Sequence, residues 1–120
     1  MPRSHQLGKL AEKRALNYLL QKGYRLRETN YRFSKAEVDL IMQQADILVC
    51  VEVKARTHLD FGHPASFISP KKIRLLGVAM DFYAQQLDEE LEVRFDVVCI
   101  TVKNQKWVIE HLENAFQILE

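Results

Sequence analysis

Residues 36–56 read AEVDLIMQQADILVCVEVKAR, and this stretch predicts two β-strands joined by a short turn. Residues 37–43 and 47–56 are rich in Val, Ile and Leu, and the Gln-Ala-Asp sequence between them is typical of a turn. Glu52 and Lys54 interrupt the apolar run of the second strand, and the two-residue period of a strand places both on one face. Because buried charges are costly without partners, this hairpin is expected to hold charged groups that compensate one another.

The register expected for this hairpin brings two acidic residues together. Pairing centred on the turn places Asp39 opposite Glu52 and Glu37 opposite Lys54. Two carboxylates that face each other repel unless a cation or a proton lies between them. A hard divalent ion such as Mg²⁺ uses one or two protein carboxylates and leaves room for phosphate oxygens. Asp39 and Glu52 are therefore candidate metal ligands beside Lys54, and a buried ion pair between Glu52 and Lys54 is the structural alternative.

Helices and further strands are predicted on both sides of this hairpin. A helix is expected over residues 5–22, ended by Gly23, and a second helix begins at Ser69 and Pro70 and runs to about Gln86. The other expected elements are strands at 24–33, 94–102 and 107–111, an irregular stretch at 57–68 and a short helix from Glu113. Helices against a sheet in this order predict an α/β fold, with residues 1–120 as a single domain.

Glu12 occupies an unusual position for a carboxylate, the narrow face of the first predicted helix. At about 100° per residue, this face also holds Gly8, Ala11 and Ala15, whose small size allows close approach to a sheet. Glu12 could therefore supply a further carboxylate to the site or hold a metal-bound water.

The composition indicates a globular protein with unevenly distributed charge. The chain has 120 residues, 48% of them hydrophobic and 28% charged, and its net charge is +1. Residues 1–35 hold nine Lys and Arg against two Asp and Glu, a balance of +7, whereas the other 85 residues balance at −6. This asymmetry favours a basic face for a polyanion, although an ordinary solvated surface explains it equally well. Because no secretory signal and no apolar stretch of roughly 18 residues is found, a cytoplasmic protein without a membrane partner is expected.

The motifs of the chain, taken in order, resemble those of the restriction-endonuclease-like superfamily. More narrowly, the chain resembles the YraN-type family of uncharacterised bacterial proteins, which are relatives of archaeal Holliday-junction resolvases. The motifs that carry the resemblance are Gly8-x-x-Ala11-Glu12-x-x-Ala15, Gly23-Tyr24, Asn30-Tyr31-Arg32, Glu37-Val38-Asp39-Leu40-Ile41, Val51-Glu52-Val53-Lys54-Ala55-Arg56, Lys72, Arg94-Phe95-Asp96-Val97-Val98 and Asn114-Ala115-Phe116. The fold that this resemblance implies is a mixed β-sheet of about five strands flanked by helices.

A metal-dependent endonuclease acting on DNA, including branched DNA, is the activity that the resemblance implies. Asp39 and Glu52 would be the metal ligands, Lys54 the catalytic lysine and Glu12 the auxiliary acid, with Mg²⁺ or Mn²⁺ as the cofactor. Resolvases cut paired strands as homodimers, so a two-fold homodimer is consistent with the resemblance. The chain departs from the family at Ala36, where Gly is usual, which restricts the backbone beside the site.

Five basic residues are candidates for contact with nucleic acid: Lys9, Lys13, Arg32, Arg56 and Lys72. Lys72 opens a predicted helix, where the helix dipole disfavours a cation unless an anion is also present. Arg56 follows the metal-binding strand, where it could contact phosphate or pair with Glu37. Arg94 and Asp96 share a strand face and are expected to pair with each other or with a neighbour.

Two other hypotheses remain open at the level of sequence. The first is a non-catalytic nucleic-acid-binding or protein-interaction module on the same fold, whose binding would weaken with salt. The second is a purely structural ion network of Glu12, Asp39, Glu52 and Lys54 that binds no metal. The two cysteines, Cys50 and Cys99, lie in apolar runs and are expected to be buried thiols.

Overall fold

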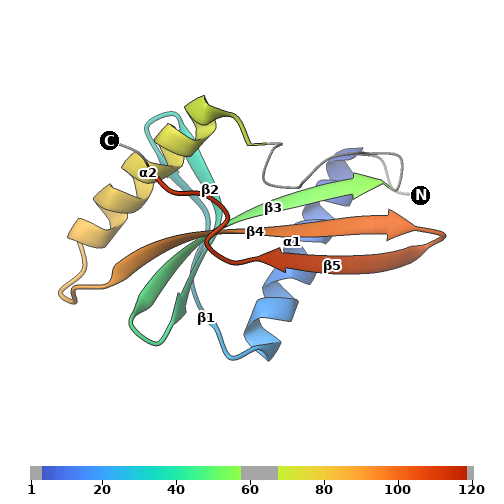
Figure 1. Ribbon diagram of the computed structural model, residues 1–120, viewed down its shortest axis with the longest axis horizontal. Helices are drawn as coiled ribbons and strands as arrows, with labels where there is room; N and C mark the ends of the chain where they lie inside the picture. Colours follow the sequence, from blue (N-terminus) through green and yellow to red (C-terminus); the bar gives the residue numbers. More distant parts are fainter. Residues whose placement is uncertain (1–3, 58–67, 119–120) are drawn as a thin grey trace.

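The computed structural model describes residues 4–57 and 68–118, which form two helices and five strands (Figure 1). The helices are α1 (Ser4–Gln21) and α2 (Pro70–Gln85). The strands are β1 (Arg25–Phe33), β2 (Ala36–Gln44), β3 (Ile47–Thr57), β4 (Glu92–Lys103) and β5 (Lys106–Leu112). The predicted α/β class, with about five strands flanked by helices, is confirmed.

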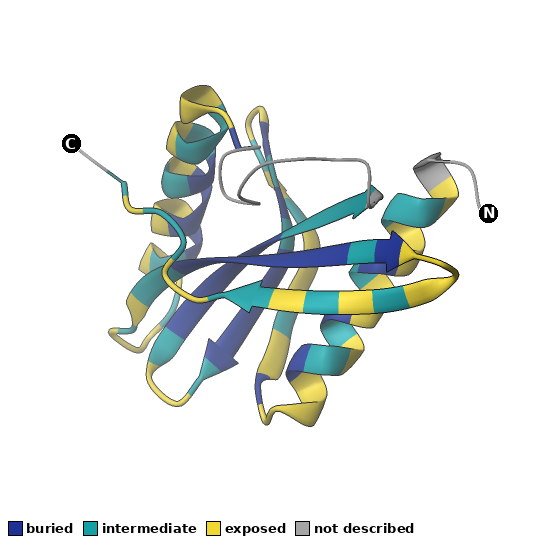
Figure 2. Cartoon of the chain, turned by 45° about the vertical axis from the view of Figure 1, so that its right-hand side comes forward, coloured by how far each residue is buried: buried dark blue, intermediate teal, exposed yellow. Residues whose placement is uncertain are grey.

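The strands form one mixed sheet in the order β1-β2-β3-β4-β5. The first three strands follow one another antiparallel, β3 and β4 are parallel, and β5 returns antiparallel to β4. α2 lies in the connection between β3 and β4, because two parallel strands need a crossover. Figure 2 shows that β4 is largely buried, whereas β5 alternates between exposed and half-buried residues at the edge of the sheet.

α1 and α2 cover opposite faces of the sheet and create two apolar layers (Figure 1). On one face, Ala11, Ala15 and Leu19 of α1 pack against the sheet. The two alanines allow the close approach that the sequence predicted. On the other face, buried side chains of α2 pack against Ile41 and Cys50 of the sheet. Glu12 of α1 and Lys72 of α2 therefore approach the sheet from opposite sides.

A buried polar cluster ties β4 to β5 and to the chain that follows. Asp96 is fully buried and accepts two hydrogen bonds of 2.8 Å from Arg94, which confirms the predicted pair. It also lies 2.8 Å from Nε2 of His111 and accepts the backbone N–H of Asn114 at 3.0 Å. Burial acts to raise the pKa of Asp96, but the hydrogen bonds from His111 and Arg94 outweigh it and hold that pKa below the ordinary value.

The short helix predicted from Glu113 is wrong, because the chain there runs along the core instead of coiling. After a turn at residues 113–114, residues 115–118 have no regular secondary structure. The backbone N–H of Ala115 donates to the carbonyl of Phe95 at 2.7 Å. Further on, Ile118 lies against Gly77 of α2, where a methyl group in place of the glycine hydrogen would meet it at 2.9 Å. These contacts hold the half-buried segment in place without helical hydrogen bonds.

Three other sequence expectations concern the cysteines, a membrane-spanning helix and the irregular stretch. Cys50 and Cys99 are buried thiols that form no disulfide, as predicted. No helix in the described ranges is long and apolar enough to cross a membrane. The irregular stretch predicted at residues 57–68 lies mostly outside the described residues, although residue 57 itself ends β3.

Candidate functional site

The site lies at the point where β2 and β3 separate. The ladder between them runs from Gln44 opposite Ile47 to Leu40 opposite Val51, in the register predicted from the turn. The predicted pair that follows, Asp39 with Glu52, does not form as a strand pair. Instead, the side chain of Asp39 accepts the backbone N–H of Val53 at 2.8 Å. The Asp39 carboxylate thus accepts a backbone N–H that would have bonded to a β2 carbonyl if the β2–β3 ladder had continued.

The side chains of β2 also switch from one face of the sheet to the other around Asp39. Val38 packs in the layer under α2, whereas Leu40 packs in the layer under α1. Since residues two apart in a regular strand share a face, the strand is irregular around Asp39. The predicted pairing of Glu37 with Lys54 is wrong as well, because the register between β2 and β3 ends at Leu40 opposite Val51. The partner of Glu37 is Arg32 of β1, with which it forms a 2.8 Å ion pair.

Glu52 is a buried carboxylate with an incomplete set of partners. Its side chain is 1% exposed, and neither carboxylate oxygen receives a hydrogen bond from any described residue. Nζ of Lys72 lies 2.6 Å from Oε2 and forms an ion pair with it. Burial and the neighbouring carboxylate of Asp39 raise the pKa of Glu52 to about 8, although Lys72 acts in the opposite direction. Removing such oxygens from water without donors is costly, so the site is incomplete by itself.

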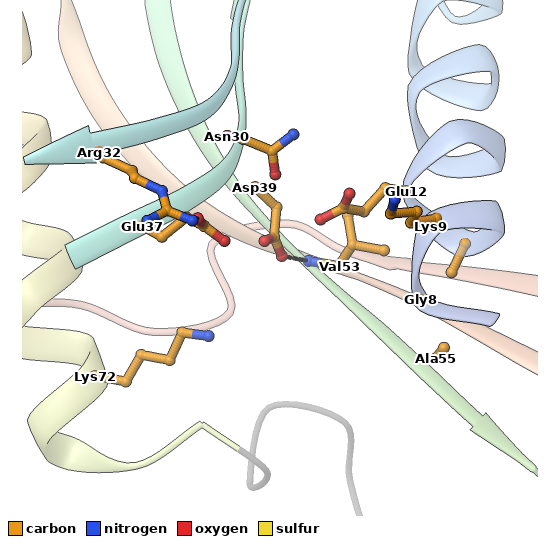
Figure 3. A pocket seen from close by; sticks show the side chains of 11 residues that line it. Gly8, Lys9, Glu12, Asn30, Arg32, Glu37, Asp39, Val53, Ala55 and Lys72 are labelled. Atoms are coloured by element: carbon orange, nitrogen blue, oxygen red, sulfur yellow. Dashed lines mark hydrogen bonds and ion pairs between the residues drawn. The ribbon is translucent and has the colours of Figure 1, made fainter. Parts of the chain in front are cut away.

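A cavity of about 550 Å³ opens beside these carboxylates (Figure 3). Its charged lining comes from four elements: Lys9 and Glu12 of α1, Arg32 of β1, Glu37 and Asp39 of β2, and Lys72 of α2. Figure 3 shows Glu12 and Asp39 with their carboxyl groups turned toward each other, while Lys72 reaches in from the opposite side. The cavity therefore brings together acidic groups suited to a cation and basic groups suited to an anion.

Glu12, which lines the cavity, is a second carboxyl group with a raised pKa. Burial, followed by the nearby Asp39 carboxylate, raises the pKa of Glu12 to about 7, and Lys9 acts weakly in the opposite direction. Glu12 and Glu52 both have raised pKa values and both interact with Asp39, so the three groups cannot all ionise cheaply at neutral pH. Either protons or a bound cation must offset their mutual repulsion.

The chemistry of these donors fits a hard divalent cation. Mg²⁺ and Mn²⁺ prefer carboxylate oxygen, and Mg²⁺ is commonly held by one or two carboxylates together with waters and phosphate oxygens. Glu52 offers buried oxygens that lack hydrogen-bond donors, and Asp39 stands next to it. Within residues 4–57 and 68–118, no three acidic, His or Cys side chains form a ready-made metal cage. Asp39 and Glu52 would therefore hold the ion as a pair, with other ligands supplied by solvent and substrate.

Comparison with known sequences identifies the family. The profile of the uncharacterised protein family UPF0102 matches residues 11–100. The chain belongs to this family. A UPF0102 protein of Flavobacterium psychrophilum is 44% identical over 97% of this chain and 98% of its own length. Relatives in Flavobacterium johnsoniae and Thermodesulfovibrio yellowstonii are 42% and 40% identical over 97% and 92% of the chain, and over 98% and 96% of their own lengths. Membership of the uncharacterised YraN-type family, predicted from the motifs, is confirmed.

In this UPF0102 protein, most of the predicted site residues meet at one place, but Lys54 does not reach the cavity. Glu12, Asp39 and Glu52 cluster as described. Lys54 is half-buried on β3 and lies in register with Cys99 of β4. Like Glu52, it is not part of the cavity lining, but unlike Glu52 it forms no ion pair with a described residue that lines the cavity. Lys72 is the lysine that contacts Glu52.

The basic residues predicted to contact nucleic acid divide into two groups. Lys9, Arg32 and Lys72 line the cavity. Lys13 is exposed on α1 outside the lining. Arg56 also lies outside the lining. Its side chain extends from β3 toward β4 and β5, where it donates to Thr101 at 3.2 Å and lies 3.9 Å from Glu110. Its predicted alternative partner, Glu37, is paired with Arg32 instead.

Asn30 is a cavity residue of this UPF0102 chain that was not among the predicted site residues. It lies on β1, and its side chain points toward Asp39 and Glu12 in Figure 3. Its φ of 50° is unusual for a strand and is tolerated by Asn better than by most residues. The sequence offered one indication of this role, an Asn within a stretch that otherwise resembles a strand. The positive φ at this position explains why the residue is Asn.

Proposed function

We propose that this UPF0102 protein is a divalent-metal-dependent endonuclease that hydrolyses phosphodiester bonds in DNA. The observation that carries the proposal is the pair of carboxylates at the separation of β2 and β3, where Glu52 is buried and the ammonium of Lys72 is its one described partner of opposite charge. Retaining such a costly arrangement is reasonable if a cation completes it during function.

The residues of the cavity, together with the neighbouring Glu52, suit each requirement of phosphodiester hydrolysis. Asp39 and Glu52 would hold Mg²⁺ or Mn²⁺, which when bound lowers the pKa of its water and neutralises charge on the phosphate. Glu12 has a pKa of about 7, which suits a group that accepts or releases a proton at neutral pH. Lys9 and Arg32 supply positive charge where the phosphate backbone enters.

DNA is favoured as the substrate by the motif resemblance and by the basic N-terminal third of the chain. The preference for branched, Holliday-junction-like DNA and the formation of a homodimer rest on the resemblance to resolvases. Lys9, Arg32 and Lys72 of the cavity lining carry positive charge, so recognition of the phosphate backbone and of DNA shape is proposed.

A cleavage assay with matched acidic variants tests the proposal. Four-way junction, flap, linear duplex and single-stranded DNA are incubated with Mg²⁺ or Mn²⁺ and with wild type, Asp39→Asn or Asp46→Asn. Asp46 is an exposed acid in the turn of the same hairpin, so Asp46→Asn controls for the loss of one negative charge. We expect cleavage by wild type and Asp46→Asn, and a loss of roughly 100-fold or more in Asp39→Asn.

Two outcomes would contradict the proposal. Cleavage that is equally strong in Asp39→Asn would come from another protein in the preparation. Salt-sensitive DNA binding without cleavage under either metal would instead support the non-catalytic nucleic-acid-binding module.

A further inference from the structure

The two lysines nearest to the proposed metal ligands are placed very differently. Lys54 follows Glu52 by two residues on β3, is half-buried and, like Glu52 itself, lies outside the cavity lining. Lys72 comes from α2, lines the cavity and brings Nζ to 2.6 Å from Oε2 of Glu52. The lysine that is close in sequence is thus not the one that is in contact.

The beginning of α2 fixes where the side chain of Lys72 starts. Pro70 occupies the first turn, and the hydroxyl of Ser69 caps the helix by accepting the backbone N–H of Lys72 at 3.1 Å. α2 packs on β2 more extensively than on the other strands, through Leu76 and its neighbours. The flexible four-carbon stem of Lys72 then reaches from this fixed point to the carboxylates.

We propose that Lys72, and not Lys54, is the lysine that serves this site. Its ammonium group holds Glu52 when no divalent ion is bound, and it contacts the substrate phosphate when an ion is bound. The ammonium lies at the carboxylate oxygen that a metal needs, so a metal at Glu52 displaces it toward the adjoining cavity. The lysine remains within reach of a phosphate there, because its stem carries several rotatable bonds. The assignment rests on the proposed function.

Cleavage by single-lysine variants separates the two assignments. Lys72→Gln and Lys54→Gln are compared with Lys71→Gln, a control at the exposed neighbouring residue of the same helix. We expect a loss of roughly 100-fold in Lys72→Gln, partial retention in Lys72→Arg, and activity within about threefold of wild type in the other two variants. Thermal unfolding of each variant shows that it is folded.

A second readout follows the lysines without relying on activity. In ¹³C-labelled protein, the lysine ε-methylene signals are recorded before and after addition of Mg²⁺, with the Lys72 signal identified by its loss in Lys72→Arg. We expect Mg²⁺ to move the Lys72 signal, because the ammonium leaves Glu52, and to leave those of Lys54 and Lys71 in place.

The outcomes distinguish failure of this inference from failure of the proposed function. If wild type cleaves DNA, but Lys54→Gln abolishes cleavage and Lys72→Gln does not, the inference is overturned and the nuclease assignment stands. If wild type does not cleave, the proposed function fails; a Lys72 signal that still responds to Mg²⁺ would support the displacement of Lys72, and an unresponsive signal would overturn it.

Discussion

Replacing Glu52 by Gln should stabilise the protein at alkaline pH while abolishing metal binding. Glu52 has a pKa of about 8 in the folded protein, against an ordinary value of 4.5. A raised pKa means that the folded state favours the protonated form. The associated stability is fully present below pH 4.5 and is lost as the pH rises toward 8. Gln resembles the protonated carboxyl group in size and stays neutral at every pH.

The size of the effect follows from the difference between the two pKa values. Each pKa unit corresponds to about 1.4 kcal/mol, so ionised Glu52 costs on the order of 5 kcal/mol above pH 8. The free energy of unfolding of Glu52→Gln, relative to wild type, should therefore rise by a similar amount between pH 4.5 and pH 9. The ion pair with Lys72 adds no separate contribution, because Lys72 lowers the pKa of Glu52 and its effect is already contained in the value of about 8.

Urea unfolding in EDTA at several pH values measures this difference. Trp107 is a suitable fluorescence reporter, since its ring lies 4.4 Å below the guanidinium group of Arg14 of α1 and should change its environment on unfolding. Subtracting the wild-type curve from the Glu52→Gln curve removes groups that titrate equally in both. Asp46→Asn, at an exposed acid, should run parallel to wild type. An equal offset between Glu52→Gln and wild type at pH 4.5 and pH 9 would refute the reasoning.

Two further substitutions test the frame around the site. Asp96→Asn should lower the free energy of unfolding by about 3–5 kcal/mol in urea titrations at pH 7, because the half-buried Arg94 loses the fully buried carboxylate that pairs with it. The pKa of Asp96 is held below its ordinary 3.8, so its ionised carboxylate stabilises the fold above pH 3.8 and this stabilisation is lost as the pH falls. The stability of Asp96→Asn should therefore fall less than that of wild type when the solution is acidified. Gly77→Ala should cost about 1–3 kcal/mol more in wild type than in an Ile118→Ala background, where the 2.9 Å contact is gone; additive effects in the double-mutant cycle would contradict this.

The helices, the strands and much of the central hairpin could be predicted because local patterns determine them. Apolar periodicity marked the strands, Ser69 and Pro70 marked the beginning of α2, and the turn set the register of β2 against β3. The small face of α1 likewise predicted its approach to the sheet. Each of these features depends on residues that are close together in the sequence.

The features that were missed depend on contacts between distant segments. The ladder ends at Leu40 because the Asp39 side chain takes the N–H of Val53, a choice that strand periodicity does not encode. The position of Lys72 follows from the packing of a helix on the far side of a long connection. The expected C-terminal helix failed for a similar reason, since tertiary contacts overrode its local propensity.

The separation of β2 and β3 beyond Leu40 explains how one fold can combine a stable core with a buried carboxylate that destabilises it. Had the ladder continued, the Val53 N–H would have remained in the sheet, and Asp39 and Glu52 would have faced each other as a strand pair. Because the strands separate, Asp39 obtains a backbone donor, while Glu52 is left buried with only the ammonium of Lys72. An apolar residue at position 52 would serve the core as well or better. Burial of Glu52 therefore destabilises the fold, and a divalent cation bound at Glu52 would offset that cost.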